Sequence, residues 1–148
     1  MGDYLEYISR SLEDTISVGK EMAKRAKAGD VLCLSGPLGA GKTAFAKGFA
    51  RGLGTPGHIS SPTFTIMQIY DNGRLPLYHF DLYRLEGMFE DSAEDIGFFD
   101  YLDGCGVTLI EWAEYAEGFL PDRAIWVEIE RIEDGSCEDG RKIYVREV

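Results

Sequence analysis

The fold of this chain follows from residues 31–43, which read Val31-Leu32-Cys33-Leu34-Ser35-Gly36-Pro37-Leu38-Gly39-Ala40-Gly41-Lys42-Thr43. Residues 31–35 are a short and nearly continuous apolar run, which is typical of a strand in the centre of a parallel sheet. Residues 42–53 combine good helix formers with apolar side chains at helical spacing, and Gly54 ends that run. The stretch therefore predicts a buried strand, a glycine-rich loop and a helix in direct succession.

The loop matches the pattern G-x-x-x-x-G-K-[ST], the P-loop, and it lies between the strand and the helix that this motif requires. Gly36 and Gly41 permit backbone conformations that a Cβ atom would obstruct, and successive amides at a helix N-terminus attract anions. Lys42 would place a full positive charge at the β- and γ-phosphates, and the Thr43 hydroxyl is placed to bind Mg²⁺. A glycine-rich turn that binds nothing is the disfavoured alternative. The predicted nucleotide-binding residues of the loop are Gly36, Leu38, Gly39, Ala40, Gly41, Lys42 and Thr43.

The remaining segments predict a mixed sheet in a single domain, because 148 residues suffice for one hydrophobic core and are too few for two domains. Asn72-Gly73 separates two β-rich runs, residues 63–70 and 75–83, and this is a strong signal for an antiparallel hairpin. The fold class is thus α/β, a P-loop NTPase-like mixed sheet flanked by helices and carrying antiparallel hairpins. The other predicted elements are a helix at 12–28, a short helix within 86–103, a buried strand at 107–110 and a pairing of 124–132 with 142–148.

The chain is strongly acidic, with 15 Lys and Arg against 26 Asp and Glu, a formal net charge of −11 and a pI near 4.6. Such a field repels phosphate backbones and anionic lipids within a Debye length of about 10 Å, which disfavours unaided nucleic-acid or membrane binding. No apolar run approaches the ~20 residues that span a bilayer, and the first residues lack the apolar region of a secretory signal. The three cysteines form no metal-ligand pattern. We therefore expect a cytoplasmic protein with reduced thiols.

Two acids at the ends of apolar strands are candidates for the metal site that a bound nucleotide needs. Asp81 and Glu111 each follow such a strand, like the acid of a Walker B element. Either could be an ordinary strand-end acid that faces water, but a P-loop in the same chain favours a role at the phosphates. His79 has no Ser or Cys nucleophile in a recognisable motif, so a packed strand histidine is the preferred interpretation. Asn72 is the only asparagine, so the Asn-Lys-x-Asp guanine signature is absent and GTP specificity is disfavoured.

Four strings, in this order and in a chain this short, resemble the TsaE (YjeE) family: Leu38-Gly39-Ala40-Gly41-Lys42-Thr43, Ser61-Pro62-Thr63-Phe64-Thr65, His79-Phe80-Asp81-Leu82-Tyr83-Arg84 and Ile110-Glu111-Trp112. The resemblance covers about residues 15–121. It implies that residues 1–148 form a single P-loop ATPase domain that uses ATP/ADP and Mg²⁺. It also implies two protein partners, TsaD and TsaB, which transfer a threonylcarbamoyl group to the tRNA adenosine beside the anticodon, while ATP hydrolysis resets that machinery.

The resemblance further implies catalytic roles. Lys42 and Thr43 keep their P-loop roles, Glu111 matches a magnesium-associated glutamate, and Asp81 matches an aspartate of a family motif. We expect Glu111 to hold the metal or to orient the attacking water, and Asp81 to hold metal-bound water or to position Thr63. Thr63 lies in a segment that resembles a nucleotide-sensing switch, where its hydroxyl could reach the γ-phosphate or the water. The expected catalytic residues are therefore Lys42, Glu111, Asp81 and Thr63, and the expected metal ligands are Thr43 and Glu111.

Two further binding residues are implied outside the loop. Thr15 matches a threonine near the adenine, although a bond within its own helix is an equal alternative. Arg141 matches a basic residue that flanks the nucleotide. No arginine finger is evident in the motifs, so isolated turnover is expected to be slow and stimulated by partners.

The net charge and the resemblance together favour docking on partner proteins. The chain should not bind tRNA strongly by itself, and the partners should contact the RNA. The acidic segment 86–103 is either the docking face or a solvated charged surface. A small-metabolite kinase and a nucleotide-sensing adaptor that does not hydrolyse ATP are the alternative functions.

Overall fold

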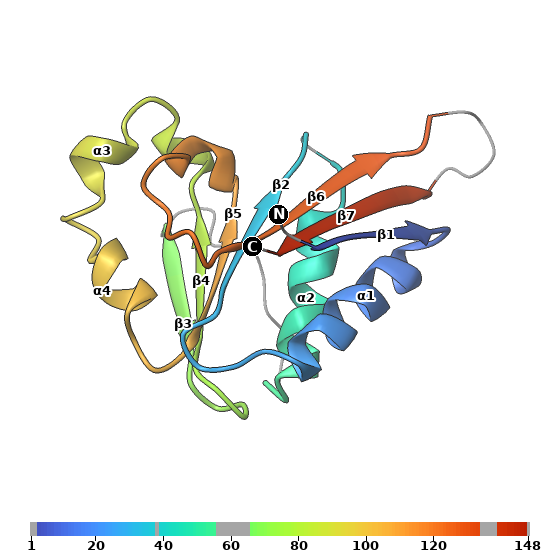
Figure 1. Cartoon of the computed structure of the whole chain (residues 1–148), viewed down its shortest axis with the longest axis horizontal. Helices are drawn as coiled ribbons and strands as arrows, with labels where there is room; N and C mark the ends of the chain where they lie inside the picture. Colours follow the sequence, from blue (N-terminus) through green and yellow to red (C-terminus); the bar gives the residue numbers. More distant parts are fainter. Residues whose placement is uncertain (1–2, 38, 56–65, 134–138, 148) are drawn as a thin grey trace.

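The computed structural model describes residues 3–37, 39–55, 66–133 and 139–147, which build one seven-stranded sheet with helices on both faces (Figure 1). The order of the strands is β1-β7-β6-β2-β5-β4-β3. The strands are β1 (Asp3–Ser9), β2 (Val31–Ser35), β3 (Met67–Tyr70), β4 (Leu77–Asp81), β5 (Val107–Glu111), β6 (Ile125–Arg131) and β7 (Arg141–Glu147). The helices are α1 (Leu12–Lys24), α2 (Lys42–Gly52), α3 (Phe89–Ser92) and α4 (Phe98–Leu102), with the 3-10 turns η1 (Tyr83–Leu85) and η2 (Ala113–Ala116).

Strand β2 occupies the centre of a parallel group formed by β6, β2, β5 and β4. Cys33 of β2 is level with Trp126 of β6 on one side and with Ile110 of β5 on the other. The outer strands are antiparallel, with β1 on β7, β7 on β6, and β3 on β4. The loop after β2 therefore leaves the sheet from its central strand, which is paired with a parallel neighbour on each side.

The two faces of the sheet bury separate cores, because side chains alternate along each strand. Leu32 and Leu34 pack with Phe45 in the core that α1 and α2 cover. Val31 and Cys33 belong to the core on the other face, under α3 and α4. Figure 1 shows the two helix pairs on opposite sides of the sheet.

The α/β class, the mixed sheet and both predicted hairpins are confirmed. The helix predicted for residues 12–28 is shorter, because α1 ends at Lys24. Ser11 caps α1 by accepting a hydrogen bond from the amide of Asp14 at 3.1 Å. Residues 63–65 of the first predicted hairpin strand lie outside the described residues. None of the helices in the described part of the chain has the length and apolar composition needed to span a bilayer.

Two features differ from the sequence-based expectation. Strand β1 is not predicted, because it is an edge strand whose Leu5 and Ile8 are 42% and 49% exposed, so no alternation between a buried and a solvated face marks it. Residues 86–103 hold two short helices rather than one, because Gly97 adopts a φ of 70° between α3 and α4.

Helices α1 and α2 touch through their backbones, and this contact holds the start of α2 in place. A Cβ on Gly48 would lie 1.9 Å from the carbonyl oxygen of Ile16, and one on Gly19 would lie 2.3 Å from that of Phe45. Such distances leave no room for a methyl group. The glycines therefore set the separation of α1 and α2.

We expect Gly48→Ala to destabilise the protein by roughly 1–3 kcal/mol, because the clash with α1 outweighs the better helix propensity of alanine. Thermal unfolding followed by circular dichroism would measure a midpoint lowered by several degrees. Ser17→Ala, at an exposed position of α1, is the control and should leave the midpoint unchanged or slightly raised. A Gly48→Ala protein as stable as the wild type would contradict this account of the helix contact.

Candidate functional site

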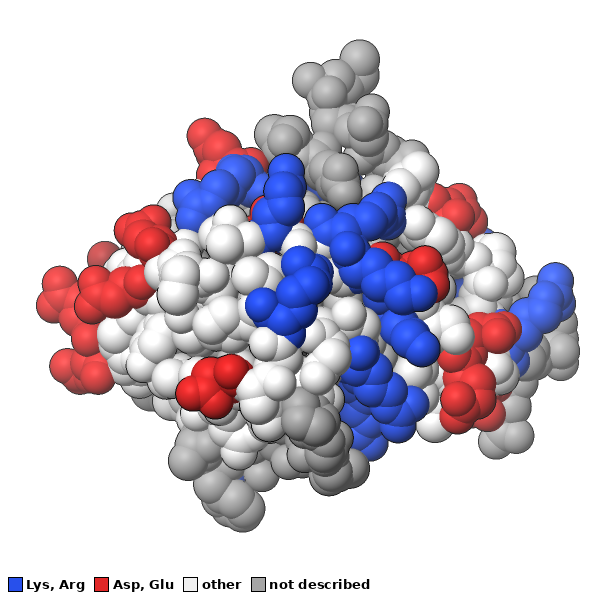
Figure 2. All heavy atoms as spheres, turned by 90° about the horizontal axis from the view of Figure 1, so that it is seen from below, with Lys and Arg blue, Asp and Glu red and all other residues white. Residues whose placement is uncertain are grey.

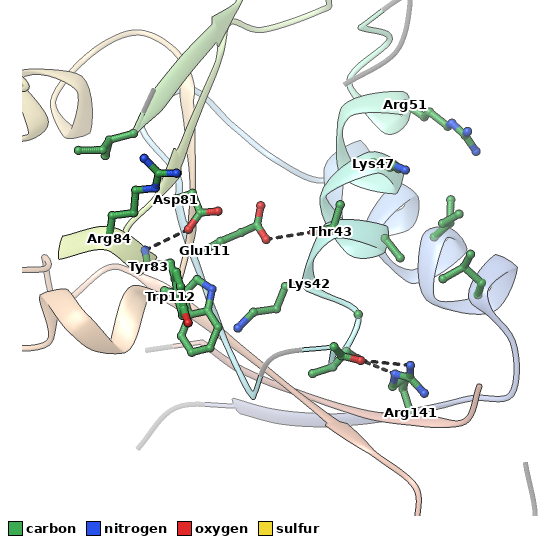
Figure 3. A pocket seen from close by; sticks show the side chains of 17 residues that line it. Lys42, Thr43, Lys47, Arg51, Asp81, Tyr83, Arg84, Glu111, Trp112 and Arg141 are labelled. Carbon is green, nitrogen blue, oxygen red and sulfur yellow. Dashed lines mark hydrogen bonds between the residues drawn. The ribbon is translucent and has the colours of Figure 1, made fainter. Parts of the chain in front are cut away.

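A cavity of about 730 Å³ opens where β2, β4 and β5 end, beside the N-terminus of α2 (Figure 3). These strands are parallel neighbours, so their carboxyl ends meet at one edge of the sheet. The loop and the first turns of α2 form one wall, and Asp81, Glu111 and Trp112 stand across from it. Leu12 and Ile16 of α1 add apolar surface. The cavity has the size of a small-molecule site.

The loop adopts a conformation that glycine favours. Gly36, Gly39 and Gly41 have φ values of 141°, 78° and 110°. A Cβ on Gly36 would lie 2.3 Å from the carbonyl oxygen of Ile129 in β6. Two features therefore favour glycine in this loop: the positive φ values, and the close approach of β6 to Gly36.

Lys42, the first residue of α2, turns its ammonium group back across the loop. Its Nζ donates a hydrogen bond to the carbonyl oxygen of Gly36 and lies 3.2 Å from the centre of the Trp112 ring. Burial lowers the pKa of Lys42, while the nearby carboxylates of Glu114, Glu111 and Asp81 oppose that shift. The ammonium group thus has a cation–π contact and a carbonyl partner inside an otherwise desolvated wall.

Thr43, Glu111 and His79 form a line from α2 into the sheet. Thr43 Oγ1 lies 3.4 Å from Glu111 Oε1, and the other oxygen, Oε2, lies 2.7 Å from His79 Nε2. Asp81 lies level with Glu111 on the neighbouring strand. Burial raises the pKa of Asp81, the backbone amide of Tyr83 that donates to Oδ1 at 3.0 Å lowers it, and the charge of Glu111 raises it further. A hydroxyl and two carboxyls at one edge are oxygen ligands of the type that Mg²⁺ prefers.

Arg141 reaches the loop from β7, 101 residues away in the sequence. Its Nε donates to the carbonyl oxygen of Ala40 at 2.7 Å, and its Nη2 donates to that of Gly39 at 3.3 Å. Figure 3 shows this guanidinium behind the loop, where it also lines the cavity. Arg141 therefore braces the carbonyl side of the loop.

The predicted site residues fall into three groups: those at the loop and cavity, one behind the loop, and two outside the described residues. Those brought together around the loop and the cavity are Gly36, Gly39, Ala40, Gly41, Lys42, Thr43, Asp81, Glu111 and Arg141. Thr15 lies behind the loop: it is buried, and its hydroxyl lies 2.7 Å from Ser9 Oγ and 3.5 Å from the carbonyl oxygen of Ser11. The bond within its own helix is thus present, and the hydroxyl is directed to β1. Leu38 and Thr63 lie outside the described residues.

Several cavity residues were not selected from the sequence, and Trp112 and Arg84 are the most informative. Trp112 adopts a φ of 59°, which is unusual for a bulky residue and keeps its ring against Lys42 and beside Tyr83, at 4.9 Å between ring centres. Arg84 comes from η1 and contributes a guanidinium to the wall that holds Asp81 (Figure 3). The expectation that the motifs contain no arginine finger stays a prediction, although Arg84 of the third string lines the cavity. Arg84 belongs to the string 79–84, which was considered for Asp81, and Trp112 belongs to the string 110–112, which was considered for Glu111.

Charge is unevenly distributed over the molecule. Residues 15–55, which carry most of α1 and all of α2, hold seven Lys or Arg and two Asp or Glu, although the whole chain has a net charge of −11. Figure 2 shows a band of Lys and Arg across one face, with acidic side chains to either side. The cavity wall itself contains five basic residues and two acids: Lys42, Lys47, Arg51, Arg84, Arg141, Asp81 and Glu111. The cavity wall therefore has an excess of positive charge that attracts an anion, although the whole chain is acidic.

The central strand, the glycine-rich loop, the following helix and the strand-end acids define a P-loop NTPase-like α/β fold. The family model described as "Threonylcarbamoyl adenosine biosynthesis protein TsaE" matches residues 9–143. The chain belongs to this family, whose members take part in tRNA threonylcarbamoyladenosine biosynthesis.

Individual relatives agree with this assignment. The tRNA threonylcarbamoyladenosine biosynthesis protein TsaE of Bacillus subtilis is 49% identical over 126 residues, which are 85% of this chain and 77% of that protein. The TsaE protein of Treponema pallidum is 41% identical over 131 residues, or 88% and 95% of the two chains. The crystal structure of Bacillus subtilis YdiB matches with a TM-score of 0.84 and 41% identity, and covers 100% of this chain and 88% of that one.

We expect Trp112 to report on occupation of the cavity. Trp126→Phe leaves Trp112 as the only tryptophan, because the chain has two. Adding Mg·ATP should draw Lys42 from the indole ring toward the phosphates and change the intrinsic emission spectrum. Lys42→Met in the same background is the control and should abolish the change. An unaltered spectrum under conditions where calorimetry detects binding would contradict the predicted movement of Lys42.

We expect Arg141→Ala to weaken ADP binding about tenfold, because the loop loses charge-assisted hydrogen bonds to two of its carbonyl groups. Isothermal titration calorimetry would measure the dissociation constant. Lys142→Ala is a matched control, since it removes one positive charge from the adjacent position of β7. Equal affinities of the two variants would show that Arg141 acts only through its charge.

Proposed function

We propose that this protein binds Mg·ATP in the cavity and hydrolyses it slowly, in a cycle stimulated by the TsaD–TsaB complex. The cycle would support threonylcarbamoyl modification of the tRNA adenosine beside the anticodon. One observation carries the proposal: Lys42, Thr43 and Glu111 converge on a single cavity at the end of the central strand. Membership of the TsaE family supports the biological setting.

The triphosphate would lie along the loop, where amides at the N-terminus of α2 and the Lys42 ammonium supply positive charge. Lys42 would exchange its contact with Trp112 for phosphate oxygens. The base would lie toward Leu12 and Ile16, which provide apolar surface at the cavity, with Arg141 at the back of the loop. Leu12 is 54% exposed, so a base would remove it from water.

The Mg²⁺ site would use the Thr43 hydroxyl and the Glu111 carboxylate. Among the residues that the structure describes, no three His, Cys, Asp or Glu side chains are grouped as metal ligands. Mg²⁺ is commonly held by one or two protein ligands together with substrate phosphates and water. Thr43 and Glu111 supply two protein ligands, and the nucleotide and water would supply the others.

Hydrolysis would proceed by in-line attack of water on the γ-phosphoryl group. The chain's own contribution is electrostatic: loop amides, Lys42 and Arg84 would neutralise the charge that develops on the phosphoryl oxygens. Glu111 would hold the metal or orient the water, and Asp81, whose pKa burial raises, would hold metal-bound water. Bound Mg²⁺ would supply further charge neutralisation at the β- and γ-phosphates.

Partner stimulation is supported by the charge distribution. A long polyanion such as tRNA would be repelled by a body with a net charge of −11, so the partner proteins would contact the RNA. The five Lys and Arg side chains of the cavity wall would instead face acidic groups of a partner within a Debye length. Docking at that face would place the partner where it can respond to the bound nucleotide.

We expect Glu111→Gln to keep ATP binding within a few fold and to lower the rate of phosphate release by roughly 10²-fold or more, since the charge of the carboxylate is lost. Phosphate release would be measured with and without purified TsaD and TsaB, and a pull-down in ATP, ADP or no nucleotide would measure docking. Glu117→Gln, at an exposed position after η2, is the control and should behave as the wild type.

Other outcomes would select a different function. A Glu111→Gln protein that still supports tRNA modification would identify a nucleotide-sensing adaptor. Transfer of labelled phosphate from ATP to a metabolite would identify a small-molecule kinase. Absence of any calorimetric heat with Mg·ATP, alone and with both partners, would end the proposal.

A further inference from the structure

His79 is a buried polar residue whose ring is engaged with the candidate metal ligand. His79 is completely buried, and the side chains of His79 and Glu111 are 1% and 3% exposed. The 2.7 Å separation of Nε2 and Glu111 Oε2 is that of a strong hydrogen bond. A carboxylate in such surroundings requires a donor, because burial without one is costly.

The sheet register explains why the two side chains meet. Asp81 is level with Glu111, and His79 precedes Asp81 by two residues, so all three side chains lie on the same face of β4 and β5. That face is the one covered by α2, because Leu77 and Leu109 belong to the core with α1 and α2. His79 therefore lies between that core and the cavity, directly behind Glu111.

The two carboxylate oxygens of Glu111 have different neighbours. Oε2 accepts from the imidazole, while Oε1 is 3.4 Å from the Thr43 hydroxyl at the cavity. A carboxylate only accepts, so Nε2 carries the proton of the bond. The other ring nitrogen, Nδ1, is buried and has no hydrogen-bond partner among the described residues. Within this part of the chain, the ring's hydrogen bond is the one from Nε2–H to Glu111.

The structure assigns His79 as a positioning residue that fixes the orientation of Glu111 toward the metal. A residue present only for packing would be apolar here, because Nδ1 gains nothing from burial. A histidine N–H that bonds a ligand carboxylate orders that carboxylate and typically changes metal affinity by 10–100-fold when removed. This role rests on the proposed function, since it presupposes that Mg²⁺ binds with the nucleotide at Thr43 and Glu111.

The test compares His79→Gln with His79→Asn. Both variants introduce the same amide group, but only the longer Gln side chain brings its N–H near the position of the imidazole Nε2. Calorimetry would measure ATP affinity in EDTA and at increasing Mg²⁺ concentration, with thermal unfolding as the check on folding. Thr108→Val, a buried residue of β5 on the opposite face, is the control for a polar deletion in the same sheet.

We expect His79→Asn to raise the Mg²⁺ concentration for half-maximal tightening of ATP about 10–100-fold, with metal-free ATP affinity unchanged. His79→Gln should restore most of the wild-type Mg²⁺ dependence, and Thr108→Val should match the wild type. Identical Mg²⁺ curves for His79→Asn and His79→Gln would overturn the positioning role and leave the proposed function intact. A wild-type protein whose ATP affinity ignores Mg²⁺ would instead remove the proposed function, and this inference with it.

Discussion

The site depends on one constraint: a glycine-rich backbone must leave the central strand, turn sharply and enter a helix without a side chain in its path. Gly36 passes close to β6, and Gly41 starts α2 with a positive φ. Both ends of the loop are anchored, because β2 is paired with β5 and β6 and α2 packs closely on α1 at glycines. Rigid support of this kind keeps the backbone donors of a loop oriented before a ligand arrives.

Electrostatics adds a second layer to this arrangement. Lys42 is desolvated and stands among carboxylates, with the Trp112 ring and a loop carbonyl as neighbours. Across the cavity, Asp81 and Glu111 bring negative charge to a place where a cation would bridge them to phosphate. The fold holds the basic and the acidic side chains of the cavity apart. The proposed metal–nucleotide complex would place its phosphates at the basic side chains and its metal ion at the acidic ones.

Sequence patterns were most reliable where a local rule decides the conformation. The apolar run of β2, the glycine-rich loop and the Asn72-Gly73 turn each predicted the observed element. Prediction failed for β1, whose exposed apolar residues pair with a strand more than a hundred positions away, and for the division of residues 86–103 into α3 and α4. The interpretation of His79 as a packed strand histidine is confirmed, because His79 is completely buried in β4, but its contact with Glu111 depends on the register of β4 and β5.

By itself, the sequence determined the loop, its flanking strand and helix, and the acids at two strand ends, because these features depend on backbone preferences and short-range spacing. Only the tertiary structure decided which distant groups meet there. Arg141 reaches the loop through the order of β6 and β7, His79 reaches Glu111 through the register of β4 and β5, and Trp112 reaches Lys42 through an unusual backbone conformation. Strand order and register arise from how all the elements pack together on the two faces of the sheet, and no local pattern of residues encodes that packing.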